Sequence, residues 1–170
     1  RAGLMAAGRT VIDIGEVPTP LVYFATYHLN TGAGIAITGS HNPPNYNGLK
    51  TVINHGPFWG DGIKDLSRRL RDDELVYGEG STESVDIRPA YQEKIQQGIK
   101  LTRPLKVVVD CGNGVPGGLA PEILHSLGAE VTPLYCQVDG QFPNHHPDPS
   151  LPENLEDLIA TVKAQSADVG

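Results

Sequence analysis

The chain has 170 residues, of which 39% are hydrophobic, so it can bury a core and is not a disordered segment. Its formal net charge is −7, which argues against nucleic acid or an anionic membrane as partner, because both bind clustered Lys and Arg. No signal peptide is visible, and no apolar stretch reaches the about 18 residues that span a bilayer. Two cysteines are too few for a secreted disulfide scaffold, and we expect a cytoplasmic protein.

Short β-rich runs alternate with helical patterns along the chain. Aliphatic and β-branched residues predict strands at 10–14, 34–38, 106–109 and 131–136. Apolar residues at helical spacing predict helices over 21–29, 63–70, 91–99, 120–127 and 152–162. This alternation indicates the α/β class, with mixed but largely parallel sheets flanked by helices.

A polar, glycine-rich segment at 76–85 divides the chain into two α/β halves, which we assign to residues 1–85 and 86–170. Residues 2–8 have the composition of a helix end without its beginning. Residues 166–170 stop where another strand is expected after the last helix. We therefore expect the chain to be a piece of a longer protein.

The segment Thr38–Lys50 has the sequence Thr-Gly-Ser-His-Asn-Pro-Pro-Asn-Tyr-Asn-Gly-Leu-Lys and follows the end of a predicted strand, where open α/β sheets bind ligands. Its glycine and prolines would expose Ser40 as a pre-positioned nucleophile, with His41 as a proton carrier and Lys50 as a fixed positive charge. Asn, Gly and Pro also favour turns that carry no chemistry. A serine hydrolase is disfavoured, because its nucleophile elbow requires G-x-S-x-G.

Residues 112–117 match the dinucleotide-binding pattern G-x-G-x-x-G, and Asp139 lies about 20 residues further on, where a ribose-binding acid is expected. Asp110 would nevertheless repel a bound pyrophosphate, and Pro116 removes an N–H that should donate to it. We favour a structural strand-to-helix turn.

Two further clusters contain metal-ligand residue types. His145, His146 and Asp148 lie in a proline-rich loop, but adjacent histidines rarely reach one ion, and we favour a structural role. Cys111 and Cys136 lie at strand ends without C-x-x-C spacing, so we expect buried free thiols.

The segment Thr38–Lys50 closely resembles the phosphoserine loop of the α-D-phosphohexomutases, in particular the bacterial phosphomannomutase/phosphoglucomutase branch. The resemblance continues, in the expected order, through residues 15–20, 107–114 and 142–149, and so covers nearly the whole chain. It implies the later part of domain one and the earlier part of domain two of a four-domain mutase.

The resemblance also implies roles for four residues. Ser40 corresponds to the serine that is phosphorylated in the resting enzyme and that transfers its phosphoryl group to the sugar. His41 and Lys50 correspond to neighbours that assist proton transfer and stabilise the phosphoryl charge. Asn42 helps to shape the loop and, with Lys50, contributes to substrate binding. Through its phosphate, Ser40 would bind Mg²⁺, whose remaining ligands belong to an acidic loop that is absent from these residues.

The activity implied is the interconversion of hexose 1-phosphate and 6-phosphate through a bisphosphorylated hexose, which also serves as activator. The partner is therefore a small phosphosugar, and the loops that choose between mannose and glucose lie outside this sequence. No sequence feature specifies an oligomeric state. Without the metal loop, we expect the isolated chain to be inactive. The alternative is a non-catalytic phosphosugar-binding or scaffold module that retains the fold.

Overall fold

The computed structural model describes residues 1–170, which form two compact units. The first contains residues 1–36 and 49–87, and the second contains residues 37–48 and 88–170. The boundary thus falls at residues 87 and 88. The loop at 37–48 packs with the second unit, although the residues on either side of it belong to the first unit. The predicted α/β class with largely parallel sheets is confirmed.

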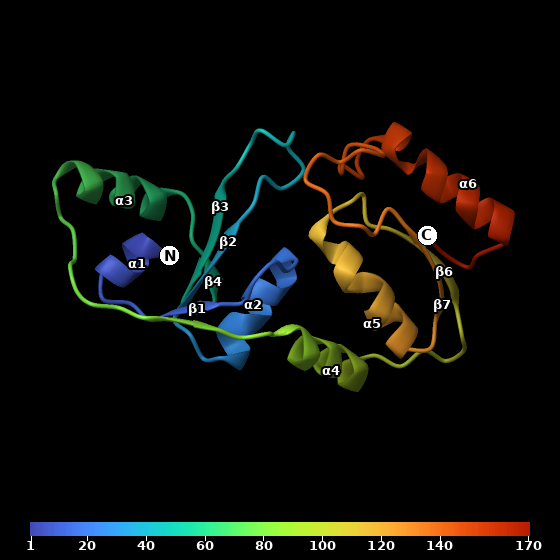
Figure 1. Ribbon diagram of the computed structural model, residues 1–170, viewed down its shortest axis with the longest axis horizontal. Coiled ribbons are helices and arrows are strands. Elements are labelled where there is room, and N and C mark those ends of the chain that lie inside the picture. Colours follow the sequence, from blue (N-terminus) through green and yellow to red (C-terminus); the bar gives the residue numbers. More distant parts are fainter. The chain divides into compact units, whose positions relative to one another are not determined.

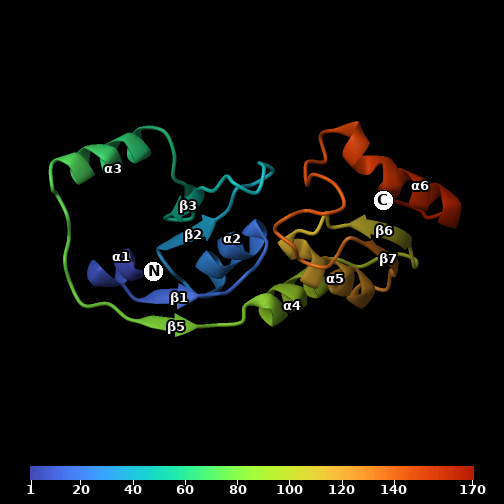
Figure 2. The same ribbon diagram turned by 45° about the horizontal axis from the view of Figure 1, so that its top comes forward.

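The first unit contains two small sheets with helices. Its elements are α1 (Ala2–Ala6), β1 (Val11–Asp13), α2 (Thr19–His28), β2 (Ala33–Ile37), β3 (Leu49–Ile53), β4 (Gly56–Pro57), α3 (Asp61–Arg71) and β5 (Thr82–Ser84). Strand β1 pairs with β5 in parallel, and Figure 2 shows them side by side. Strands β2, β3 and β4 form the second sheet in that order, with β3 and β4 antiparallel.

Helix α2 supplies the largest part of the first unit's core. Pro20 lies at its start, where a missing N–H costs no hydrogen bond. Its buried side chains are Leu21, Val22, Ala25 and Thr26. Gly34 of β2 lies so close to this face that a Cβ there would be 2.6 Å from the Thr26 methyl carbon. Glycine at this position therefore lets α2 pack directly on the sheet.

The second unit is built around a parallel pair of strands. Its elements are α4 (Arg88–Gly98), β6 (Lys106–Asp110), the 3-10 turn η1 (Val115–Gly118), α5 (Ala120–Ser126), β7 (Glu130–Leu134), the 3-10 turn η2 (Pro152–Leu155) and α6 (Glu156–Gln165) (Figure 1). The β6–β7 register runs from Lys106 opposite Glu130 to Asp110 opposite Leu134. Both strands therefore end at the same edge, where their following loops meet.

Several features of the second unit follow directly from its sequence. Val108 of β6, Leu119 and Ala129 are buried and form the centre of the core. Gly128 has a φ of +91° just after α5, which is the left-handed conformation common at helix C-termini. The predicted helix at 152–162 begins with a 3-10 turn before α6.

Strand β5 was not anticipated, because its sequence lies within the polar segment interpreted as a boundary. Its side chains, Thr82 to Ser84, are all exposed, and its pairing with β1 is made by the backbone. Such a strand leaves no apolar alternation in the sequence. No helix of this chain combines the length and the apolar character needed to cross a lipid bilayer.

Candidate active site: the serine loop

The serine loop, residues 37–48, connects β2 to β3 and is closed at its base by backbone hydrogen bonding. The Thr38 N–H donates to the Gly48 carbonyl over 3.0 Å. Gly39 lies against the opposite side of the loop, and a Cβ there would be 2.7 Å from the Tyr46 carbonyl oxygen. Any other residue at 39 would push the two sides apart. Glycine before the serine thus makes the loop compact as well as flexible in φ.

Ser40 lies at a strained position of this loop with its side chain exposed. Its φ is +56°, a left-handed conformation that costs a non-glycine residue on the order of 1–3 kcal/mol. Local hydrogen bonds support it. The Ser40 N–H donates to Thr38 Oγ1 over 2.9 Å. The backbone N–H and the Nδ2 of Asn42 both donate to the Gly39 carbonyl, over 3.1 and 2.8 Å.

His41 connects the serine loop to a second loop of the same unit. Its Nδ1 lies 2.6 Å from the Pro147 carbonyl oxygen. Lys50 is placed differently, as an exposed residue of β3 in the first unit. The structure therefore brings Ser40, His41 and Asn42 together in one loop of the second unit.

The turn after β6 is filled by protein atoms. The Asp110 carboxylate accepts a hydrogen bond from the Gly112 N–H over 2.8 Å. Both of its oxygens lie 3.1 Å from His145 Nε2. A Cβ on Gly112 would be 3.2 Å from the His145 ring, and one on Gly117 would overlap the backbone of Cys136. The glycine spacing that resembles a dinucleotide motif is thus explained by close packing.

His145 has a raised pKa, for reasons that can be separated. Burial alone would lower the pKa of its imidazole. The hydrogen bond between Nδ1 and the His146 carbonyl, at 3.0 Å, and the bond to Asp110 both stabilise the protonated ring and outweigh burial. The Asp110 side chain is only 7% exposed and the His145 side chain 17%, so this contact is shielded from solvent.

The residues described hold no metal centre of their own. No group of three or more His, Cys, Asp or Glu side chains among residues 1–170 is arranged to bind an ion. Asp148 accepts hydrogen bonds from the N–H and the Oγ of Ser150, which lower the pKa of its carboxyl.

Cys111 and Cys136 form a pair of free thiols at the ends of the two parallel strands. Cys136 Sγ donates to Cys111 Sγ over 3.4 Å. The prediction of buried free thiols is met only in part, because both thiols are free but half-buried. Burial, together with the neighbouring thiol, raises the pKa of Cys111 to about 12. At neutral pH Cys111 is therefore a thiol and a poor nucleophile.

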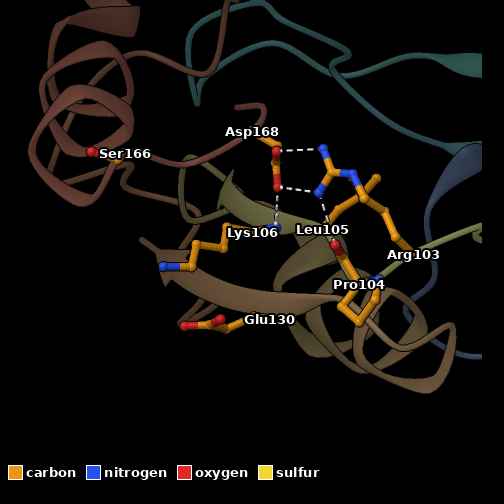
Figure 3. A pocket seen from close by; sticks show the side chains of 7 residues that line it. All are labelled: Arg103, Pro104, Leu105, Lys106, Glu130, Ser166 and Asp168. Carbon is orange, nitrogen blue, oxygen red and sulfur yellow. Dashed lines mark hydrogen bonds and ion pairs between the residues drawn. The ribbon is translucent and has the colours of Figure 1, made fainter.

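A cavity of about 380 Å³ lies beside the first residues of β6 and β7, and Figure 3 shows its lining. The lining residues are Arg103, Pro104, Leu105, Lys106, Glu130, Ser166 and Asp168. The Arg103 guanidinium donates to both Asp168 oxygens, over 2.6 and 3.1 Å, which lowers the pKa of Asp168 to about 2. The Arg103 cation is thus already paired with a carboxylate.

This chain is similar in sequence to known proteins over nearly its whole length. Residues 1–73 match the family model for phosphoglucomutase/phosphomannomutase, alpha/beta/alpha domain I, and residues 89–170 match domain II of the same family. A phosphomannomutase/phosphoglucomutase of Pseudomonas aeruginosa is 52% identical over 168 residues, which are 99% of this chain and 36% of that protein. A phosphoglucomutase of Neisseria gonorrhoeae is 46% identical over 170 residues, covering 99% of this chain and 37% of that protein.

The solved structures agree with the sequence relatives. The crystal structure of a phosphoglucomutase/phosphomannomutase family protein from Burkholderia thailandensis superimposes with a TM-score of 0.91 at 47% identity, covering 97% of this chain and 38% of that chain. The chain thus spans little more than a third of the length of the curated relatives it matches. Since two models of one family match most of its residues and the fold agrees, the chain belongs to the phosphoglucomutase/phosphomannomutase family.

Proposed function

We propose that the protein containing this chain interconverts hexose 1-phosphate and hexose 6-phosphate, of mannose, glucose or both, with Ser40 as the phosphoryl carrier. The observation that carries this proposal is the conformation of the serine loop. Ser40 is exposed, its backbone is held in a left-handed conformation, and hydrogen bonds from Ser40 itself and from Asn42 support the loop on both sides. A hydroxyl held in this way is pre-positioned for group transfer.

The reaction would consist of two phosphoryl transfers. In the first, the bond between phosphorus and Ser40 Oγ breaks, and a bond forms to the free hydroxyl of the hexose monophosphate. The sugar hydroxyl proton passes to a base, Ser40 Oγ takes up a proton to become a hydroxyl again, and the product is a bisphosphorylated hexose. In the second, that sugar turns over and returns its other phosphoryl group to Ser40. A free bisphosphorylated hexose could phosphorylate Ser40 initially and so act as the activator.

We assign the remaining roles by the family resemblance. His41 would assist proton transfer, Lys50 would stabilise the phosphoryl charge and bind substrate, and Asn42 would shape the loop and face the sugar. In the whole enzyme, Mg²⁺ would balance the charge of the transferring phosphoryl group, and phosphorylated Ser40 would supply one oxygen ligand to the ion. This chain supplies no carboxylate cluster to complete such a site, so we expect no turnover from the isolated 170 residues.

The test uses the full-length protein with Ser40→Ala and, as a matched control, Ser67→Ala on the exposed surface of α3. A coupled dehydrogenase assay measures conversion of glucose 1-phosphate, and of mannose 1-phosphate with the corresponding coupling enzymes, in the presence of bisphosphorylated hexose. Intact mass and peptide mapping report phosphate on Ser40. We expect Ser40→Ala to reduce turnover to background and to lose the phosphate, while Ser67→Ala behaves like the unmodified protein.

Two results would contradict the proposal. Turnover retained in Ser40→Ala would exclude Ser40 as the carrier. An unphosphorylated, inactive full-length protein that still binds phosphosugars would instead favour the non-catalytic binding or scaffold module. Turnover by the purified 170-residue chain would overturn its expected inactivity.

A further inference from the structure

The loop that contacts His41, residues 142–149, is attached at three points, two near the end of β6 and one in η2. The first is Asn144, whose Nδ2 donates to Asn113 Oδ1 over 2.8 Å. Asn113 is only 4% exposed, and its own Nδ2 donates to the Gln137 carbonyl over 2.9 Å. That second bond fixes which end of the Asn113 amide carries the oxygen. Asn113 is thus a buried, oriented acceptor for this loop.

The second attachment is the contact of His145 Nε2 with the two Asp110 carboxylate oxygens, at 3.1 Å each, and the third comes from η2. Asn154 is 8% exposed, and its Nδ2 donates to the Asp148 carbonyl over 2.8 Å. Pro147 therefore lies between two anchored neighbours, and its own ring fixes φ.

The anchored Pro147 carbonyl is the group that lies 2.6 Å from His41 Nδ1. A carbonyl oxygen can only accept, so Nδ1 must carry the hydrogen. In the neutral ring, the lone pair is then on Nε2. This hydrogen bond fixes both the orientation of the imidazole and its tautomer. Because His41 follows Ser40 directly, this hydrogen bond holds the side chain next to the serine.

We propose that residues 142–149 are a positioning element for the serine loop, in which the Pro147 carbonyl selects the Nδ1–H tautomer of His41 and the buried Asn113, Asp110 and Asn154 hold that carbonyl in place. The histidine-rich sequence of this loop therefore serves to place another histidine. The tautomer follows from the geometry alone, whereas its effect on turnover rests on the proposed function.

The primary experiment measures the tautomer of His41 in the full-length protein carrying ¹⁵N-labelled histidine. Multiple-bond ¹H–¹⁵N correlation spectra distinguish Nδ1–H from Nε2–H, and the signal that disappears in His41→Asn identifies the residue. Asn154→Ala and Asn144→Ala each remove one attachment. His146→Ala is the control, because it lies in the same loop but removes none of the three attachments.

We expect His41 of the unmodified protein and of His146→Ala to be the Nδ1–H tautomer. Both asparagine variants should shift His41 towards Nε2–H. Asn144 is exposed, so its variant remains informative if loss of the buried Asn154 prevents folding. An Nε2–H tautomer in the unmodified protein, or an unchanged tautomer in a folded Asn144→Ala, would overturn the proposal.

Kinetics give a second and separable readout. If the protein is a mutase, the asparagine variants should lower kcat by about 10- to 100-fold, the effect of a small displacement of a reacting group, with KM for the hexose phosphate within about 2-fold. His41→Asn keeps a donor near the position of Nδ1 and should retain more Ser40 phosphorylation than His41→Ala. Equal loss in both His41 variants would contradict the positioning role. A protein with no mutase activity would refute the proposed function, while the tautomer would still decide this inference.

Discussion

Replacing Gly117 by alanine tests how the turn after β6 is built. Gly117 lies in η1, directly against the chain that leaves β7. A Cβ at this position would be 2.0 Å from the Cys136 carbonyl oxygen, 2.6 Å from its carbonyl carbon and 2.8 Å from its Cα. A real Cβ essentially never lies closer than 3.0 Å to another heavy atom, and all three obstacles here are backbone atoms. Either η1 or the segment after β7 must therefore move by roughly 1 Å, since backbone cannot rotate aside.

The size of the effect follows from this overlap. Overpacking costs about 1–3 kcal/mol where side chains can adjust, and sometimes more, so a backbone obstacle places Gly117→Ala at about 3 kcal/mol. Gly118 is the matched control, because a Cβ there would meet nothing within 4 Å. Its φ does not lie in the left-handed region, so alanine should be neutral or should stabilise by up to about 1 kcal/mol.

The two variants can be compared by urea unfolding and by hydrogen–deuterium exchange. Trp59, the one tryptophan, lies in the first unit, so its fluorescence does not report on this turn. Exchange of the β6 and β7 amides does. We expect faster exchange in Gly117→Ala and no acceleration in Gly118→Ala. If the free energies of unfolding of the two variants agree within about 0.5 kcal/mol, the packing explanation of this glycine is wrong.

Three further predictions follow from the described contacts. The pKa of His145 is raised above 6.5 despite its burial, so its contribution to stability is complete below pH 6.5 and is lost as the pH rises through the folded-state pKa. The free energy of unfolding measured across pH should therefore fall over this range, and that fall should be absent in His145→Gln. Cys111 should react with iodoacetamide far more slowly at pH 7.5 than a free thiol does, and reaction at an ordinary rate would contradict its raised pKa. Leu21→Ala should lose about 2–5 kcal/mol in urea unfolding, because the side chain is 1% exposed, whereas the exposed Leu75→Ala should change by less than about 0.5 kcal/mol.

The parts of the fold that were predictable are those whose causes are local in sequence. The stripe of Leu21, Val22 and Ala25 indicated α2, because burial of one helix face leaves a periodic pattern. Gly128 indicated the end of α5 for a similar reason. Strand β5 left no such trace, since its pairing with β1 involves only backbone groups and its side chains face solvent. A strand held by main-chain bonds at a sheet edge is visible only once its partner is placed.

The candidate site shows the same division. Gly39 next to Ser40 and the prolines that follow predicted an exposed serine in a constrained loop; Ser40 is exposed, and its φ is +56°. The hydrogen bond of His41 to Pro147 joins residues 106 positions apart, and the pairing of Asp110 with His145 joins residues 35 apart. No local pattern encodes these contacts. The glycines at 112–117 were ambiguous for the same reason, because their obstacle, the Cys136 backbone, lies beyond the whole of α5.

An energetic comparison shows why contacts from outside the serine loop are needed. The left-handed conformation of Ser40 costs on the order of 1–3 kcal/mol, and the local bonds involving Thr38 and Asn42 contribute about 0.5–1.5 kcal/mol each, so the two effects roughly cancel. An exposed loop balanced in this way would sample several conformations. The bond from His41 to Pro147 adds little energy but connects the loop to buried polar residues that cannot move freely. On the proposed positioning role, placement of the exposed nucleophile would depend on side chains such as Asn113 and Asn154, which are only 4% and 8% exposed. Loss of the exposed Asn144, which donates to Asn113, should therefore impair turnover of the full-length protein without unfolding it.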